Sequence, residues 1–171
     1  MFEKLKPDFT FDSYIEVTPE FLTEQGIEAL LIDIDNTLAP YEQAEPDEKL
    51  FAWFSSLEKA GVRAALISNN KEERVELFNK ELKLPAYPDA HKPSKKTLLI
   101  ALEALGADIA HAAVMGDQLF TDAYGGKHIG MRAIIVPPIK DKKTLFFRFK
   151  RALEKPIMKS YYRERRKNCE K

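Results

Sequence analysis

Carboxylates and other polar side chains interrupt an otherwise apolar pattern at four places in this sequence. Each group follows a short apolar run, and the first lies in the stretch ALLIDIDNTLAPY, residues 29–41. The four groups are Asp33 with Asp35, Ser68 with Asn69 and Asn70, Lys92, and Gly116-Asp117 with Asp122. Oxygen-rich sets of this kind bind hard divalent cations such as Mg²⁺. The residue types therefore predict a cation site, provided that the fold brings the groups together.

The segments that must position these groups alternate between strand and helix. Continuous apolar runs predict buried strands at residues 29–34, 62–67, 86–87, 112–115 and 133–136. Helical spacing follows Pro19, spans residues 46–61, follows Asn70, runs from Pro93 to near Gly106, and recurs within 116–130. Asn70 with Glu73 fits a capping box. The alternation predicts an α/β fold, a three-layer doubly wound parallel sheet with helices on both faces.

In such a sheet the carboxyl ends of the strands lie at one edge, where ligands bind. The four polar groups would therefore meet there. Taken singly, each has an ordinary explanation, since Ser68 and Asn70 can cap a helix, Lys92 can be a solvated charge, and Gly116-Asp117 can form a turn. Taken together, several carboxylates at a partly buried edge repel one another unless a cation neutralises them. We therefore favour a Mg²⁺ site.

The same residues resemble the four motifs of the haloacid-dehalogenase (HAD) superfamily of phosphotransferases. Residues 33–38, DIDNTL, match the first motif, Ser68 the second, Lys92 the third, and Gly116-Asp117 with Asp122 the fourth. The match covers about residues 28–136. The chain looks like the YqeG-type branch of subclass IIIA, in which Asn36 stands where many relatives have glycine. That branch is similar to phosphatidylglycerophosphate phosphatases.

This resemblance implies a Rossmann-like HAD fold and a Mg²⁺-dependent phosphomonoester hydrolase. Asp33 would be the nucleophile that forms an aspartyl-phosphate, and Asp35 the general acid and base. Ser68, Asn69 and Lys92 would bind the phosphoryl group. The metal ligands would be Asp33, Asp35 through its backbone carbonyl, and Asp117, with Asp122 as a ligand or a support for one.

The spacing between motifs leaves no room for a cap domain. An open site suits a bulky substrate such as a lipid head group, a protein or a nucleic acid end. Otherwise a partner subunit, such as a second copy in a homo-oligomer, must close the site. Phosphatidylglycerophosphate is the leading substrate hypothesis. Alternatives are a phosphatase of a soluble phosphometabolite or nucleotide, and a non-catalytic phosphate- or metal-binding module that contacts RNA or a membrane. A further alternative is a receiver-type phosphoacceptor domain. Such a domain uses a single acylated aspartate and would not need Asp35.

Composition and charge divide the chain into two parts. The 171 residues, 44% hydrophobic and 32% charged, suit a single globular domain. The net charge of zero conceals 14 Lys/Arg against 23 Asp/Glu in residues 1–139, and 13 against 4 in residues 140–171. We expect residues 1–139 to form the catalytic domain and residues 140–171 a basic amphipathic segment, divided at Pro156.

The basic segment has two interpretations. In the first, its apolar side packs against the core; in the second, the segment lies on an anionic surface. The apolar side is formed by Leu145, Phe146, Phe149, Leu153, Ile157 and Met158. A membrane is favoured over RNA for that surface. With Cys169 as the single cysteine and no long apolar run, we expect a cytoplasmic protein with peripheral membrane contact.

Overall fold

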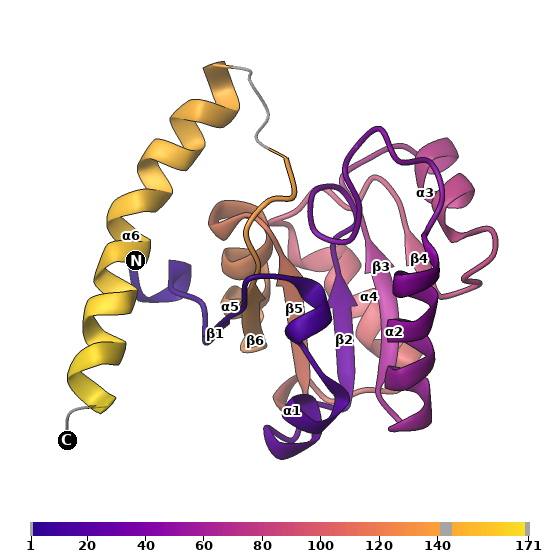
Figure 1. The fold of residues 1–171 in the computed structure, drawn as a ribbon, viewed down its shortest axis with the longest axis horizontal. Helices are drawn as coiled ribbons and strands as arrows, with labels where there is room; N and C mark the ends of the chain where they lie inside the picture. Colours follow the sequence, from indigo (N-terminus) through magenta and orange to yellow (C-terminus); the bar gives the residue numbers. More distant parts are fainter. Residues whose placement is uncertain (1, 141–144, 170–171) are drawn as a thin grey trace.

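A computed structural model describes the backbone of residues 2–140 and 145–169, with the side chains of residues 4–140, 149 and 152–166. Its centre is one sheet of six parallel strands in the order β1-β6-β5-β2-β3-β4 (Figure 1). The strands are β1 Phe9–Thr10, β2 Ala29–Ile32, β3 Arg63–Ile67, β4 Ala86–Tyr87, β5 Ala112–Gly116 and β6 Arg132–Ile135.

Helices cover both faces of this sheet, so the predicted three-layer fold is confirmed. Side chains of α1, α2 and α3 pack on one face, and those of α4 and α6 on the other, where α5 also lies. The helices are α1 Pro19–Glu24, α2 Glu48–Lys59, α3 Glu72–Asn79, α4 Lys95–Leu105, α5 Tyr124–Ile129 and α6 Leu145–Cys169. Short turns complete the chain: η1 Phe2–Leu5, η2 Tyr14–Glu16, η3 Ile109–His111 and the π-helical turn η4 Leu119–Ala123.

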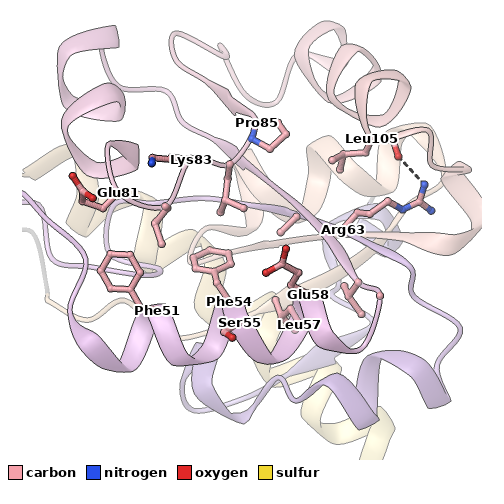
Figure 2. A pocket seen from close by; sticks show the side chains of 15 residues that line it. Phe51, Phe54, Ser55, Leu57, Glu58, Arg63, Glu81, Lys83, Pro85 and Leu105 are labelled. Carbon is pink, nitrogen blue, oxygen red and sulfur yellow. Dashed lines mark hydrogen bonds between the residues drawn. The ribbon is translucent and has the colours of Figure 1, made fainter.

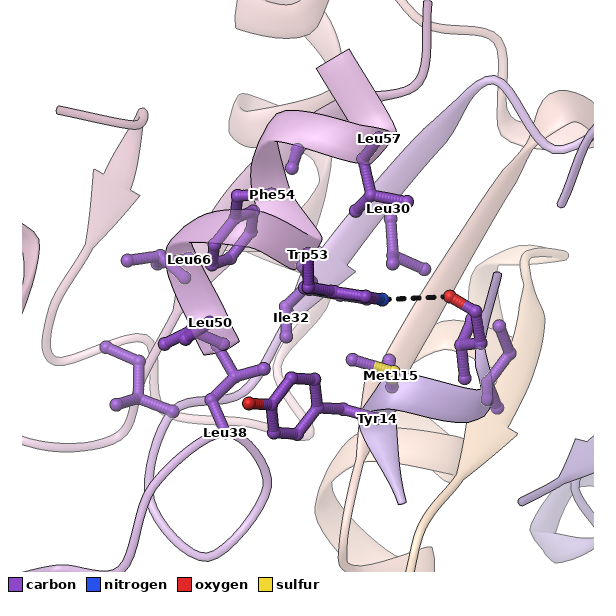
Figure 3. Close-up of a cluster of buried hydrophobic side chains, with 14 of the residues drawn as sticks. Tyr14, Leu30, Ile32, Leu38, Leu50, Trp53, Phe54, Leu57, Leu66 and Met115 are labelled. Carbon is purple, nitrogen blue, oxygen red and sulfur yellow. Dashed lines mark hydrogen bonds between the residues drawn. The ribbon is translucent and has the colours of Figure 1, made fainter. Parts of the chain in front are cut away.

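The core on the α2 face fixes the amino-terminal segment to the sheet (Figure 3). Trp53 of α2 lies over the sheet and donates its indole N–H to the carbonyl of Val17 at 3.0 Å. Its ring also meets Tyr14 edge to face, with centroids 5.2 Å apart. Since β2 is buried along its whole length, the continuous apolar run reflects a strand covered on both faces.

The structure corrects three local predictions. Strand β1 was not predicted, because Phe9 and Thr10 form no continuous apolar run. Asn70 does not cap a helix: α3 has Lys71 as N-cap without a side-chain bond, because Asn70 is engaged with Asp35. Helix α6 continues through Pro156, whose ring is exposed. Buried contacts of α6 on both sides of the proline, at Glu154 and Ile157, hold the two halves on the body of the protein.

Helix α6 runs along the edge of the molecule beside η1 and β1 (Figure 1). Ile157 and Tyr161 are buried, whereas Phe149 and Leu153 are 63% and 46% exposed. The predicted apolar side is therefore only partly packed on the core. The side chains of Leu145, Phe146, Arg148, Lys150, Arg151 and Cys169 lie outside the described residues.

No separate cap domain lies between the motifs. The chain from Asp33 to Ser68 forms one loop, α2 and β3, and the chain from Ser68 to Lys92 forms α3 and β4. Among the described helices, none is both long and apolar enough to cross a bilayer.

Candidate active site

The sheet register brings the first and fourth motifs together. Strand β2 lies between β3 and β5, with Ile32 opposite Leu66 on one side and Met115 on the other. Asp33 continues this pairing, because its N–H donates to the carbonyl of Met115 at 2.9 Å. The residues just after β2 and β5 are therefore neighbours at the carboxyl edge of the sheet.

Three carboxylates converge at this edge. One oxygen each from Asp33, Asp117 and Asp122 lies within 4.8 Å of the others. The three residues are only 8%, 2% and 1% exposed. The ammonium of Lys92, also buried, lies 2.6 Å from Asp33 Oδ1 and 2.7 Å from Asp122 Oδ1. Lys92 thus pairs with two of the three acids.

Burial and the neighbouring charges shift the ionisation of Asp33 and Lys92. Burial, with the nearby carboxylates of Asp122 and Asp117, raises the pKa of Asp33 to about 7 against the opposing effect of Lys92. Burial disfavours the charge of Lys92, but the carboxylates of Asp122 and Asp33 outweigh it and raise the pKa of that ammonium above its ordinary value. Lys92 therefore stays charged beside the carboxylates of Asp33 and Asp122.

A Mg²⁺ ion fits this donor set. The clustered atoms are carboxylate oxygens, the ligands that Mg²⁺ prefers. Buried carboxylates that lie this close together repel one another, and a divalent ion held between them offsets that repulsion. Asp33, Asp117 and Asp122 are therefore the residues that would hold the ion.

The loop after β5 is folded tightly around Asp122. Asp122 Oδ2 accepts the N–H of Gln118 at 3.1 Å and the hydroxyl of Thr121 at 3.2 Å. At Gly116 a Cβ would lie 2.2 Å from Asp122 Cγ, so only glycine leaves room for the carboxylate against the strand end. This explains the glycine of the fourth motif.

The loop after β2 is folded around Asp33 in a similar way. Thr37 donates its hydroxyl to Asp33 Oδ2 at 3.1 Å. Asn36 adopts a φ of +67°, a left-handed conformation that asparagine tolerates and glycine adopts freely. Its N–H donates to the carbonyl of Ala39 at 2.7 Å, which closes the turn. The backbone conformation thus accounts for an asparagine at position 36.

The loop after β3 positions Lys92. The amide of Asn69 accepts the Lys92 N–H at 2.6 Å and donates to the Lys92 carbonyl at 3.2 Å. Ser68 is 1% exposed, and its Oγ accepts the N–H of Asn70 at 3.0 Å. As an acceptor in that bond, the Ser68 hydroxyl keeps its own proton for another partner.

Asp35 lies in a second group, beside the acid cluster. Its Oδ1 is 3.3 Å from Arg74 Nε and 3.2 Å from Arg74 Nη2, and its Oδ2 accepts from the side chain of Asn70 at 3.1 Å. Arg74 comes from α3 and also donates to the carbonyl of Ala44. Asp35 of the first motif is therefore joined to α3 by an ion pair that spacing alone did not predict.

Two cavities differ in their relation to this edge. One of about 660 Å³ lies between α2 and the segment before β4, at the amino end of β3, where Arg63 bonds to the carbonyl of Leu105 (Figure 2). It contains none of the predicted site residues. A smaller cavity of about 190 Å³ has Asp117 in its wall, together with Thr10, Val136, and Glu154 and Met158 of α6.

Sequence reasoning identified the residues of the acid cluster but missed their supports. The structure brings Asp33, Lys92, Asp117 and Asp122 into contact range as predicted. It shows Asn69 bonded to the backbone of Lys92. The missed residues are Thr37, Arg74, Asn70 in its contact with Asp35, and Glu154. Of these, only Thr37 lies within a recognisable motif.

Comparisons with known proteins agree with this geometry. A family model described as HAD-hydrolase-like matches residues 89–144, which include Lys92, Asp117 and Asp122. A Bacillus subtilis (strain 168) protein named "Probable phosphatase YqeG" is 32% identical over 158 residues, 92% of each chain. An uncharacterized protein from Listeria monocytogenes serotype 4b has a similar fold, with a TM-score of 0.54 and 16% identity over 69% of this chain and 85% of that one. This chain therefore belongs to the YqeG family of phosphatases within the HAD superfamily.

Proposed function

We propose that this protein is a Mg²⁺-dependent phosphomonoester hydrolase that works through an aspartyl-phosphate on Asp33. The observation that supports this most directly is the contact of buried Asp33 with Lys92 beside two further carboxylates. A carboxylate next to a fixed ammonium and a cation site is suited to attack a phosphoryl group, whose negative charge would otherwise repel it.

In the first step an oxygen of Asp33 attacks phosphorus, and the bond from phosphorus to the ester oxygen breaks. Asp35 gives its proton to that oxygen, so that the leaving group departs as an alcohol. Lys92 and the Ser68 hydroxyl hold phosphoryl oxygens in line with Asp33. Asn69 sets the backbone of Lys92 through its paired amide bonds.

In the second step water attacks phosphorus and gives a proton to the Asp35 carboxylate. The bond between phosphorus and the Asp33 oxygen breaks, which releases inorganic phosphate and restores both residues. Arg74 and Asn70 orient the Asp35 carboxylate between the two steps. A bound Mg²⁺, held by Asp33, Asp117, Asp122 and the backbone carbonyl of Asp35, would offset the negative charge of the phosphoryl oxygens.

The chemistry is tested with the purified full-length protein and an aryl phosphate. We expect hydrolysis with Mg²⁺, none with excess chelator, and a loss of about 10³-fold or more in kcat for Asp33→Asn. The control is Asp108→Asn, which replaces the exposed N-cap of η3 with another residue that caps well. This substitution should not change kcat. Absence of metal-dependent turnover in the wild-type protein would instead favour a non-catalytic phosphate- or metal-binding module.

For the substrate we favour a phosphorylated lipid head group, with phosphatidylglycerophosphate as the leading candidate. No cap domain is inserted between the motifs in residues 33–122, which leaves the carboxyl edge open to a substrate embedded in a bilayer surface. Helix α6 presents four exposed cations on one side: Lys155, Lys159, Arg163 and Arg166. Within the described residues none of the four forms an ion pair. Such a row attracts an anionic membrane, by about 1 kcal/mol for each cation near the surface.

The lipid proposal predicts two results. First, kcat/KM for phosphatidylglycerophosphate in mixed vesicles exceeds that for soluble sugar phosphates and nucleotides. Second, Lys159→Glu with Arg163→Glu weakens binding to anionic vesicles, whereas Lys49→Glu with Lys59→Glu on α2, an equal charge change, does not. Preference for a soluble phosphometabolite, or equal effects of both charge reversals, would refute it. If the protein binds RNA more strongly than vesicles at the same salt concentration, the four cations of α6 would instead form an RNA-binding surface.

A further inference from the structure

Helix α6 reaches the loop of the fourth motif through one buried carboxylate. Glu154 is 4% exposed, and its Oε1 accepts the N–H of Leu119 at 2.9 Å. Leu119 is the first residue of the turn η4, two residues after Asp117 and three before Asp122. The contact therefore fixes the backbone between two carboxylates of the cluster.

This hydrogen bond has a clear physical basis. The first N–H groups of a helical turn have no acceptor inside the turn, and the side chain of Gln118, at the N-cap of η4, does not supply one. A buried carboxylate that accepts such an N–H forms a charge-assisted bond, and neither group can be left unpaired without a penalty. Glu154 and Asp117 also line the same 190 Å³ cavity, so the helix lies directly beside the cluster.

We propose that Glu154 is a positioning residue for the cation site, so that docking of α6 sets the geometry of the loop from Asp117 to Asp122. The inference rests on the proposed function in that it takes these two residues as cation ligands. Glu154 touches neither substrate nor metal in this role. It acts through Leu119, whose N–H it holds.

Other contacts of α6 provide the contrast. Ile157 is buried in the core cluster that includes Leu119, but its side chain is apolar and makes no hydrogen bond to the loop. Tyr161 is buried farther along the helix, where its hydroxyl lies 3.4 Å from the carbonyl of Asp8. If α6 merely stabilised the fold, weakening any of these contacts would have the same consequence. If Glu154 positions the loop, only its substitution alters cation binding.

The experiment is calorimetric titration of the substrate-free, full-length protein with Mg²⁺. We expect Glu154→Leu, which removes the acceptor, to weaken Mg²⁺ binding by about 10-fold or more, as is typical when a partner of a metal ligand is lost. Glu154→Gln keeps an oxygen for the Leu119 N–H and should remain within about threefold of the wild type. Ile157→Ala should lower Tm without changing the affinity.

Coupling between two sites is reciprocal, which gives a second readout. Mg²⁺ should slow amide hydrogen exchange in α6 of the wild-type protein, and this protection should be lost in Glu154→Leu. Unchanged Mg²⁺ affinity in Glu154→Leu, or an equal loss in Ile157→Ala, would overturn the inference while leaving the proposed function intact. Failure of the wild-type protein to bind Mg²⁺ would overturn both.

Discussion

The ammonium of Lys92 lies 2.6 Å from Asp33 Oδ1, and both side chains are almost completely buried. Lys92 also pairs with Asp122 at 2.7 Å, so one side chain joins the first motif to the fourth. Asp33 and Asp122 therefore share the cation of Lys92.

We therefore predict that Lys92→Met destabilises the metal-free protein. The substitution leaves Asp33 and Asp122 buried without their cation, and breaking a buried ion pair costs about 3 kcal/mol or more. The free energy of unfolding, measured with urea in the presence of a chelator, should fall by this amount. Lys71→Met is the control, because its partner Asp89 is at the surface and the midpoint should not move. Equal midpoints for the two variants would contradict the prediction.

The affinity for Mg²⁺ should depend on pH. With the pKa of Asp33 near 7 in the folded, metal-free state, this carboxyl is largely protonated at pH 6 and must lose its proton to bind the ion. The dissociation constant should fall by about fivefold from pH 6 to pH 7 and by about 10-fold from pH 6 to pH 8, and it should level off above pH 8. Calorimetry in buffers of different ionisation enthalpy measures the released proton. A constant affinity and no proton release would show that Asp33 is already ionised.

The same shift predicts how the stability of the metal-free protein depends on pH. The ordinary pKa of 3.8 applies in the unfolded chain, and the raised pKa of Asp33 in the folded one. Between about pH 4 and pH 7 the folded state holds the proton that the unfolded state has lost, so this group lowers the free energy of unfolding as pH rises. Comparison of urea midpoints with those of Asp33→Asn isolates the contribution, because the variant lacks the titrating group.

Arg74 should matter for turnover more than for stability. Since Arg74 donates to Asp35 through Nε and forms an ion pair with it through Nη2, Arg74→Gln frees the proposed general acid to rotate. We expect kcat for an aryl phosphate to fall by about 10-fold or more while KM changes by less than about twofold. The control is Arg63→Gln at the opposite end of β3, which loses bonds to the carbonyls of Leu105 and Gly106. It should lower Tm but not kcat; the reverse pattern would contradict the assignment.

Backbone strain at Asn36 gives a prediction that is independent of chemistry. Because its φ is +67°, Asn36→Gly should be tolerated, whereas Asn36→Ala should cost about 1–2 kcal/mol. Urea unfolding of both variants measures the difference. Equal stability of the alanine and glycine variants would mean that the turn relaxes to another conformation.

Local patterns along the chain were sufficient to predict the architecture. The apolar runs of β2, β3, β5 and β6 are continuous because parallel strands are buried on both faces. This pattern can be recognised in the sequence without knowing which strands pair. Topology then required the residues after these strands to share one edge. Asp33, Lys92, Asp117 and Asp122 could therefore be grouped from the sequence.

The folded chain decided which side chain pairs with which. Both ends of the Asn69 amide bond to the Lys92 backbone, and Asn70 turns away from α3 toward Asp35. Glu154 meets Leu119 across a sequence separation of 35 residues. Such contacts carry no periodic signal, because they depend on loop conformations and helix docking rather than on the order of residues within one element. The sequence thus determines where the chemistry lies, and tertiary packing determines how its groups are held.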